Sequence, residues 1–234
     1  MKQHEMLQLK CDNFAIVINM SNLTRAETTT FHWVICQLSV GHPLPVSHFT
    51  QAELEKMQQK AHTAMVRRSG HAKSTARVVI EGPEHVGGVG HFHFYNLQGC
   101  GQIECFIKFW RSPTTKPGSM LRIAVHWAQF CAGTGWSILH DTETRLVHLE
   151  AKWLASLRNF LASINAMMQL RDPGIPPTQR QHDSHIMDHV MSAHKPFKPC
   201  EIRRINCCRL HLNVVTVSDI ADASGHRILQ SMVD

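Results

Sequence analysis

The basic segment between residues 56 and 77 is the strongest candidate for chemistry in this sequence. It contains no aspartate or glutamate, and its six cations are Lys56, Lys60, Arg67, Arg68, Lys73 and Arg77. Basic side chains at this density, interleaved with serine and threonine hydroxyls, hold phosphate groups without reading a base sequence. The segment therefore predicts a binding site for a nucleic-acid backbone. A solvated basic face that binds nothing is the alternative.

A second cluster combines histidine, cysteine and aspartate. The run HDSHIMDH contains His182, His185 and His189, which share one face if the run is helical. Further potential ligands follow at Cys200, Cys207, Cys208 and His211. A Cys and a His four residues apart on a helix can ligate zinc, but CxxC and HExxH are both missing. A zinc-stabilised helical interaction module over 182–211 is the alternative function, and exposed or hydrogen-bonded histidines are the reading without a ligand.

Motifs for catalysis and nucleotide binding are missing from the sequence. GxSxG, GxGxxG and GxxxxGK(S/T) do not occur, and GGVG at 87–90 is followed by HFHF, which does not start a helix. The chain has no Asp-Asp pair to hold two magnesium ions. We therefore expect no catalytic residue and no cofactor, and no metal outside the zinc alternative.

Composition limits the class of protein. The chain has 234 residues, 43% hydrophobic and 18% charged, which suits one large or two small packed domains. Its longest apolar run, Phe14 to Ile18, is too short to span a membrane, and the first residues lack a signal-peptide core. The eight cysteines then indicate thiols of a cytoplasmic or nuclear protein. The net charge of +6 suits a polyanionic partner.

Helix signals position the basic segment. Thr24 with Glu27, and Thr50 with Glu53, have the capping-box spacing that starts a helix. The helix predicted at 50–68 ends before Gly70 and has one apolar face, made of Leu54, Met57, Ala61 and Met65. It would bring the first cations of the basic segment near one another.

The fold class predicted is mainly α, with one helical half at 1–115, a second at 116–234 and at most short strands. Further helices are expected at 101–111, 120–133, 142–168, 182–193 and 201–212, and short strands at 78–80 and 212–217. In the helix at 142–168, Trp153 and Leu157 lie in the middle of an apolar stripe and are expected to be buried. The run RDPGIPP predicts a linker near 171–178.

Three short motifs resemble one protein family. They are HPLP at 42–45, GPEHVGGVG at 82–90 and NLQGCGQI at 96–103. In this order they resemble the region downstream of the polymerase core in retroelement reverse transcriptases of the non-LTR-like type. In that family a YPLP element, a lysine-rich helix, a GP..LGG.G loop and Y.EQG..Q follow the catalytic aspartates. Segments 139–161 and 182–220 also look like that region in retrotransposon-derived reading frames of algal genomes.

The resemblance implies a chain that begins after the polymerase palm. Residues 1–115 would be a thumb-like helical region and 116–234 a C-terminal helical extension. The family's Tyr/Phe-x-Asp-Asp turn is missing here, which implies a non-catalytic fragment. Its partners would be template–primer nucleic acid, held by the basic segment, and the rest of a retroelement polyprotein. Where related frames carry Tyr, this chain has His42, His71, His211 and Cys207, so a decayed copy without activity is a further alternative.

Overall fold

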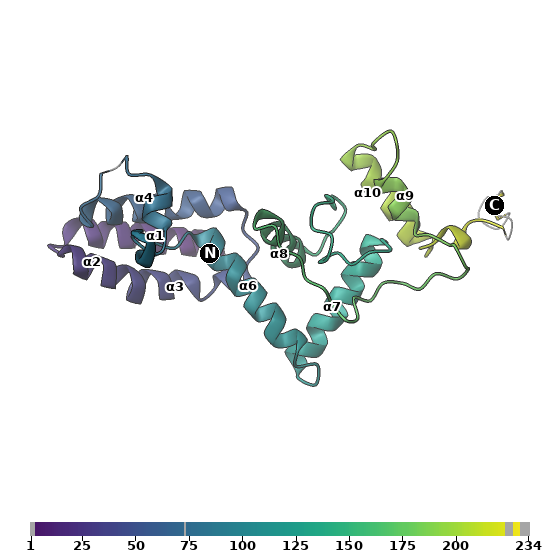
Figure 1. Ribbon diagram of the computed structural model, residues 1–234, viewed down its shortest axis with the longest axis horizontal. Coiled ribbons are helices and arrows are strands. Elements are labelled where there is room, and N and C mark those ends of the chain that lie inside the picture. Colours follow the sequence, from purple (N-terminus) through teal and green to yellow (C-terminus); the bar gives the residue numbers. More distant parts are fainter. Residues whose placement is uncertain (1–2, 73, 223–226, 230–234) are drawn as a thin grey trace. The chain divides into compact units, whose positions relative to one another are not determined.

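The computed structural model describes residues 3–72, 74–222 and 227–229. These residues are mainly helical, and they contain isolated β-bridges but no strand or sheet (Figure 1). The prediction of a mainly α fold is therefore confirmed. The chain divides into two compact units, called here unit 1 (Met1–Cys105) and unit 2 (Phe106–Asp234).

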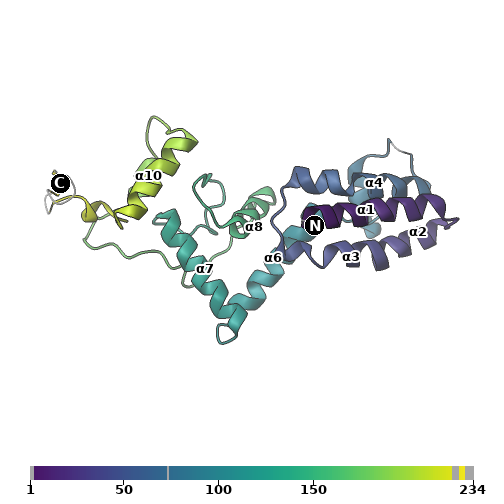
Figure 2. The same cartoon turned by 180° about the vertical axis from the view of Figure 1, so that it is seen from behind.

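Unit 1 begins with helices that lie side by side (Figures 1 and 2). They are α1 (Gln3–Met20), α2 (Arg25–Phe31), a π-helical turn (His32–Gln37), α3 (Leu38–Gly41) and α4 (Gln51–Arg68). Both predicted capping boxes are present: Thr24 caps α2 and Thr50 caps α4. The stop at Gly70 is also present, with φ of 80°, a left-handed conformation that glycine adopts without a steric penalty.

The main core of unit 1 lies where α1 packs against α3 and α4. It is formed by Leu7, Cys11, Val40, Leu44, Leu54, Met57, Ala61 and Phe94. Helix α1 was not predicted. Its buried residues, Leu7, Cys11, Ala15 and Ile18, follow a helical spacing, but the exposed Leu9, Ile16 and Val17 beside them hide that period in the sequence.

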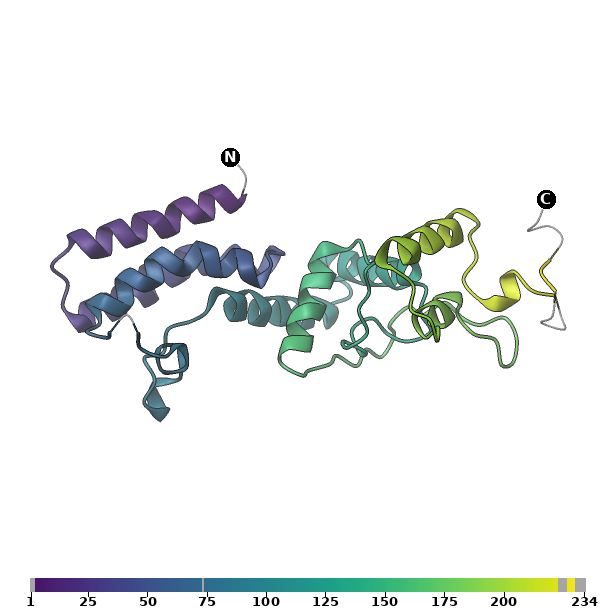
Figure 3. The same cartoon turned by 90° about the horizontal axis from the view of Figure 1, so that it is seen from above.

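The chain between α4 and α6 lies to one side of the helices (Figure 3). The strand predicted at 78–80 is wrong, because Arg77–Glu81 forms the short helix α5. Its last carbonyls accept from the returning loop: Val89 N–H donates to Val79 O at 2.9 Å and His91 N–H to Ile80 O at 3.0 Å. Residues 87–90 form a loop, and Gly88 approaches Gly82 so closely that a Cβ on Gly88 would lie 2.0 Å from Gly82 O.

Helix α6 (Phe94–Trp110) begins earlier than the helix predicted at 101–111. Its buried Gln98 and Gln102 hold the loop before α4: Gln98 Oε1 accepts from Ser47 Oγ at 2.7 Å, and Gln102 Nε2 donates to Ser47 O at 2.7 Å. A Cβ at Gly101 would lie 2.5 Å from Pro45 Cγ. Two of the motifs behind the family resemblance, 42–45 and 96–103, therefore pack against each other.

Unit 2 contains the remaining helices. They are α7 (Lys116–Ala132), α8 (Lys152–Ser163), α9 (Ile186–Met191) and α10 (Pro199–His211). The predicted stop of α7 at Gly133 is confirmed. Buried Arg209 of α10 joins the two helices, because its Nη2 donates to Phe130 O at 2.8 Å and to Cys131 O at 2.9 Å at the end of α7.

The single helix predicted over 142–168 is wrong, since only Lys152–Ser163 is helical. Asp141 Oδ1 accepts from the N–H groups of Glu143 and Thr144, each at 3.0 Å, and such an Asx turn competes with a helix. Leu157 is fully buried as expected, whereas Trp153 is half-buried.

Two other expectations in unit 2 need correction. Residues 212–217 form no strand; there, the described residues show an isolated bridge between His185 and Thr216. The helix predicted at 182–193 is shorter, because α9 begins only at Ile186. Residues 172–178, where a linker is predicted, have no regular secondary structure.

Candidate nucleic-acid interface

One exposed face of α4 carries a row of cations. Lys56, Lys60 and Arg67 are exposed, and at positions i, i+4 and i+11 they lie along the same side of the helix. The apolar face that includes Leu54 and Met57 is buried in the core, which fixes which side of α4 meets solvent. We call Lys56, Lys60 and Arg67 the basic stripe. The structure thus brings three of the six predicted residues onto one surface.

A shallow groove between α1 and α4 borders the basic stripe. It has a volume of about 530 Å³, and both Lys60 and Arg67 line it. Lys60 Nζ lies 3.1 Å from Asp12 Oδ2 of α1. An exposed pair of this kind contributes only about 0–1 kcal/mol, so a phosphate can replace the carboxylate at little cost. Among the described residues, Lys56 and Arg67 have no ion-pair partner.

Arg68 has a structural contact that the sequence does not show. Its Nη2 donates to Asn19 O at 2.9 Å, in the last turn of α1. The last carbonyls of a helix have no partner within the helix, and a cation there also complements the helix dipole. Arg68 therefore holds the end of α1, and it does not belong to the basic stripe.

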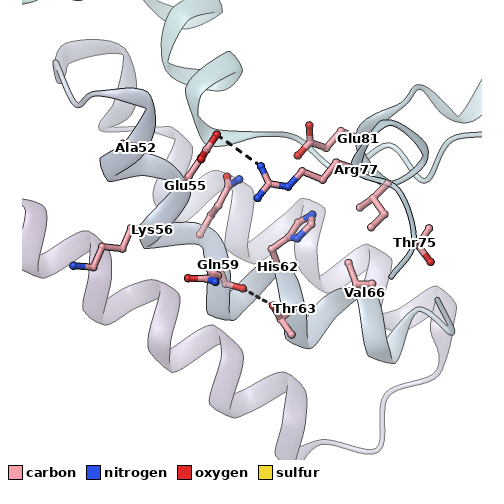
Figure 4. A pocket seen from close by; sticks show the side chains of 12 residues that line it. Ala52, Glu55, Lys56, Gln59, His62, Thr63, Val66, Thr75, Arg77 and Glu81 are labelled. Atoms are coloured by element: carbon pink, nitrogen blue, oxygen red, sulfur yellow. Dashed lines mark hydrogen bonds and ion pairs between the residues drawn. The ribbon is translucent and has the colours of Figure 1, made fainter. Parts of the chain in front are cut away.

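Arg77 borders a different cleft, on the α5 side of α4. This cleft has a volume of about 440 Å³ and is lined by residues that include Lys56, Arg77 and Glu81. Figure 4 shows Arg77 between Glu55 and Glu81, with the Lys56 side chain extending away from it. The guanidinium lies 3.7 Å from Glu55 Oε1. Arg77 therefore shares a cleft with Lys56 but is paired with Glu55, and it does not belong to the basic stripe. Lys73 lies outside the described residues.

Three imidazoles at and behind this cleft form a group that sequence reasoning missed, in which two rings are buried and that of His62 is half-buried. They are His32 of the π-helical turn, His62 of α4 and His91 before α6, and we call them the histidine cluster. The ring centroids of His32 and His91 lie 4.9 Å apart, and those of His62 and His91 6.0 Å apart. In a chain with 18 histidines, no spacing distinguishes these three.

The histidine cluster is held in its neutral form. His32 and His91 are 5% and 1% exposed, and neither ring has a hydrogen-bond partner among the described residues. Burial, with a smaller contribution from the neighbouring imidazoles, lowers the pKa of His32 to about 4 and that of His91 to about 3. The same causes, with Arg77 close by, lower the pKa of His62.

The second predicted cluster, at 182–211, does not converge. His182 precedes α9 and has φ of 64°, so it cannot share a helix face with His185 and His189. His185 Nε2 contacts Pro176 O at 2.9 Å, while His189 Nε2 contacts Ser184 Oγ at 2.6 Å. No group of three potential ligands able to hold a metal ion exists in the described part of the chain.

Comparison of the chain with protein-family models, curated proteins and solved structures finds no match. No helix within the described ranges is long and apolar enough to cross a membrane.

Proposed function

We propose that this chain is a non-catalytic C-terminal fragment of a retrotransposon reverse transcriptase that binds template–primer nucleic acid. The observation that carries the proposal is the basic stripe, because three exposed cations on one rigid helix form a surface for consecutive phosphates. At 1.5 Å per residue, Lys56 to Arg67 spans about 16 Å, or about five base pairs along a duplex. Such contacts position a nucleic acid without reading its sequence.

The motifs that resemble the reverse-transcriptase family also support the proposal. HPLP at 42–45 lies against 96–103 through Pro45 and Gly101, and the loop at 82–90 closes on itself, with Gly90 N–H donating to Gly82 O at 2.8 Å. These motifs thus have definite structural roles in unit 1. On this proposal the rest of a retroelement polyprotein is a further partner, and the protein acts in the cytoplasm or nucleus.

Replacing the basic stripe is expected to weaken duplex binding and to reduce its salt dependence. In the Lys56→Gln, Lys60→Gln, Arg67→Gln variant, up to three fewer phosphates are neutralised. The slope of log affinity against log salt should then become shallower by up to about 2.7, at about 0.9 per phosphate. Filter binding with two unrelated duplexes, titrated between about 50 and 200 mM salt, measures both quantities.

The matched control removes the same charge elsewhere. Lys108, Arg111 and Lys116 are also exposed cations, and their triple glutamine variant has the same net charge as the stripe variant. It should bind nearly as the wild type does. If both variants lose equal affinity, net charge alone explains binding; if the stripe variant binds as the wild type does, α4 is only a solvated face.

The purified chain is expected to extend no primer with magnesium or manganese. The sequence lacks the Asp-Asp pair that holds two metal ions in the family it resembles. Primer extension on a primed template, compared with a control without protein, tests this. Extension that copurifies with the chain would contradict the proposal.

A further inference from the structure

A second cleft in unit 1 has an aromatic wall. Its volume is about 630 Å³, within the range of small-molecule sites, and it lies between the helical run of α2 and the segment 81–92. Trp33 and Phe92 meet edge to face there, with ring centroids 5.0 Å apart and an interplanar angle of 89°. Phe92 remains 42% exposed. We call this site the aromatic cleft.

Besides Thr29 and Thr30, the lining of the aromatic cleft includes two titratable residues. One is the half-buried Glu81, whose carboxylate can accept hydrogen bonds. The other is His91, which is 1% exposed and has no hydrogen-bond partner for either ring nitrogen among the described residues. Buried polar groups in proteins are normally paired. A buried imidazole without a partner at the wall of an open cleft therefore indicates a ligand that supplies one.

The aromatic cleft adjoins the cleft that contains Arg77 and Lys56, because Glu81 lines both. The histidine cluster connects the same two sites: His62 lines the cleft that contains Arg77, His91 lines the aromatic cleft, and their rings are in edge contact. An apolar wall for a flat ring thus adjoins a cleft whose lining includes two cations, Lys56 and Arg77, of which Arg77 is paired with Glu55. An aromatic wall next to a cation complements the flat base and the negative phosphate of a nucleotide.

We propose that the aromatic cleft takes up one unpaired base of a nucleic acid whose phosphates contact α4. The base stacks on the exposed ring of Phe92, as single-stranded bases do on aromatic side chains. Its exocyclic amino group donates to Glu81, the contact that carboxylates make with cytosine N4. The His91 ring nitrogens are buried without the ligand, and a turn of the ring toward the base would let one of them make the second polar contact. This inference rests on the proposed function and adds a preference for a duplex with an unpaired end.

The test compares a blunt duplex with the same duplex carrying a one-nucleotide cytosine or thymine overhang. Fluorescence anisotropy of a dye on the far end measures each affinity for the full chain. Stacking of one base on an aromatic side chain predicts roughly tenfold tighter binding of the cytosine overhang than of the blunt end. Thymine has no exocyclic amino group for Glu81, so its overhang should bind roughly fivefold more weakly than the cytosine one.

Two variants locate the effect. Phe92→Leu should bring the overhang-to-blunt ratio close to one. Phe197→Leu is its matched control, because Phe197 is 41% exposed and lies outside the cleft, and it should keep the wild-type ratio. Glu81→Met should abolish the preference for cytosine over thymine. Since each readout is a ratio, a general gain or loss of phosphate affinity cancels.

The outcomes separate the two proposals. Equal affinities of the wild type for blunt and overhang duplexes, with the salt dependence intact, would overturn the base site and leave the proposed function standing. A preference that survives Phe92→Leu would also overturn it, without depending on the folding of any other variant. Failure of the wild type to bind either duplex would overturn the proposed function and this inference together.

Discussion

Acidification from pH 7 to pH 4.5 is expected to destabilise unit 1 by about 5 kcal/mol. The cause is the histidine cluster. In the unfolded chain an imidazole takes up a proton below about pH 6.5, whereas in the folded unit burial holds the pKa of His32 near 4 and that of His91 near 3. The unfolded state therefore binds more protons across this window, so the free energy of unfolding falls as the pH falls.

The size of this loss of stability follows from the linkage between proton binding and unfolding. Each such histidine changes the free energy of unfolding by about 1.4 kcal/mol per pH unit between the unfolded and folded pKa values. Two of them across about two pH units give about 5 kcal/mol, and His62, whose pKa is also lowered, adds to this. The free energy of unfolding of a domain is about 5–15 kcal/mol, so a loss of about 5 kcal/mol is at least a third of it.

Hydrogen exchange followed by mass spectrometry measures this for each unit. Protection factors of peptides from α4 should fall steeply below pH 6.5. The protection factors of peptides from α8 should fall less, because His148 is the one described histidine of unit 2 with a lowered pKa. His32→Leu should make the dependence of α4 shallower by about 1.4 kcal/mol per pH unit, and His42→Gln, at an exposed position of unit 1, is its control. Equal protection of α4 at both pH values would mean that the imidazoles are not buried.

The candidate site shows which features follow from local sequence. Lys56, Lys60 and Arg67 were placed correctly together, because the capping box at Thr50 and the buried positions of α4 determine the helix and its exposed face. Arg77 was not placed correctly with them. Its neighbour Glu55 precedes the acid-free segment and becomes its ion-pair partner only when α5 folds back toward α4. Counting charges along the chain cannot detect carboxylates that tertiary structure brings in.

The histidine cluster and the aromatic cleft were not predictable for the same reason. Their residues come from three separate parts of unit 1, and no short spacing relates His32, His62 and His91. The loop at 82–90 positions His91 and Phe92, and its glycines indicate a turn in the sequence but not where that turn leads. The capped helices α2 and α4 were predictable from local sequence, whereas the convergence of side chains from separate elements was not.

Residues 142–151 of unit 2 show how a tertiary contact overrides periodicity. Leu146 and Leu149 continue the apolar spacing of α8, yet the chain there is turned. Arg158, 4% exposed, donates from Nε to Ile138 O at 2.9 Å and from Nη2 to Asp141 O at 2.6 Å, with Thr144 O as a third acceptor. A guanidinium presents several donors in one plane, which suits three carbonyls of one loop.

Arg158→Met is expected to lower the free energy of unfolding of unit 2 by about 3–5 kcal/mol. Methionine keeps an apolar stem but leaves three carbonyls without their hydrogen-bond donor. Each buried carbonyl without a hydrogen bond costs about 1–3 kcal/mol. Arg158→Lys should recover only part of this, since one ammonium cannot reach all three oxygens in a fixed fork. Urea unfolding followed by far-UV circular dichroism measures the change.

The matched control is Arg145→Met, which removes the same charge from the same loop at an exposed position. It should shift the free energy of unfolding by no more than about 0.5 kcal/mol. The helical signal of the folded protein is a second readout, because periodicity alone favours a helix over 142–151. If Arg158→Met unfolds at the wild-type midpoint, the guanidinium does not hold the loop; a rise in helix content with it would show that the apolar spacing governs these residues after all.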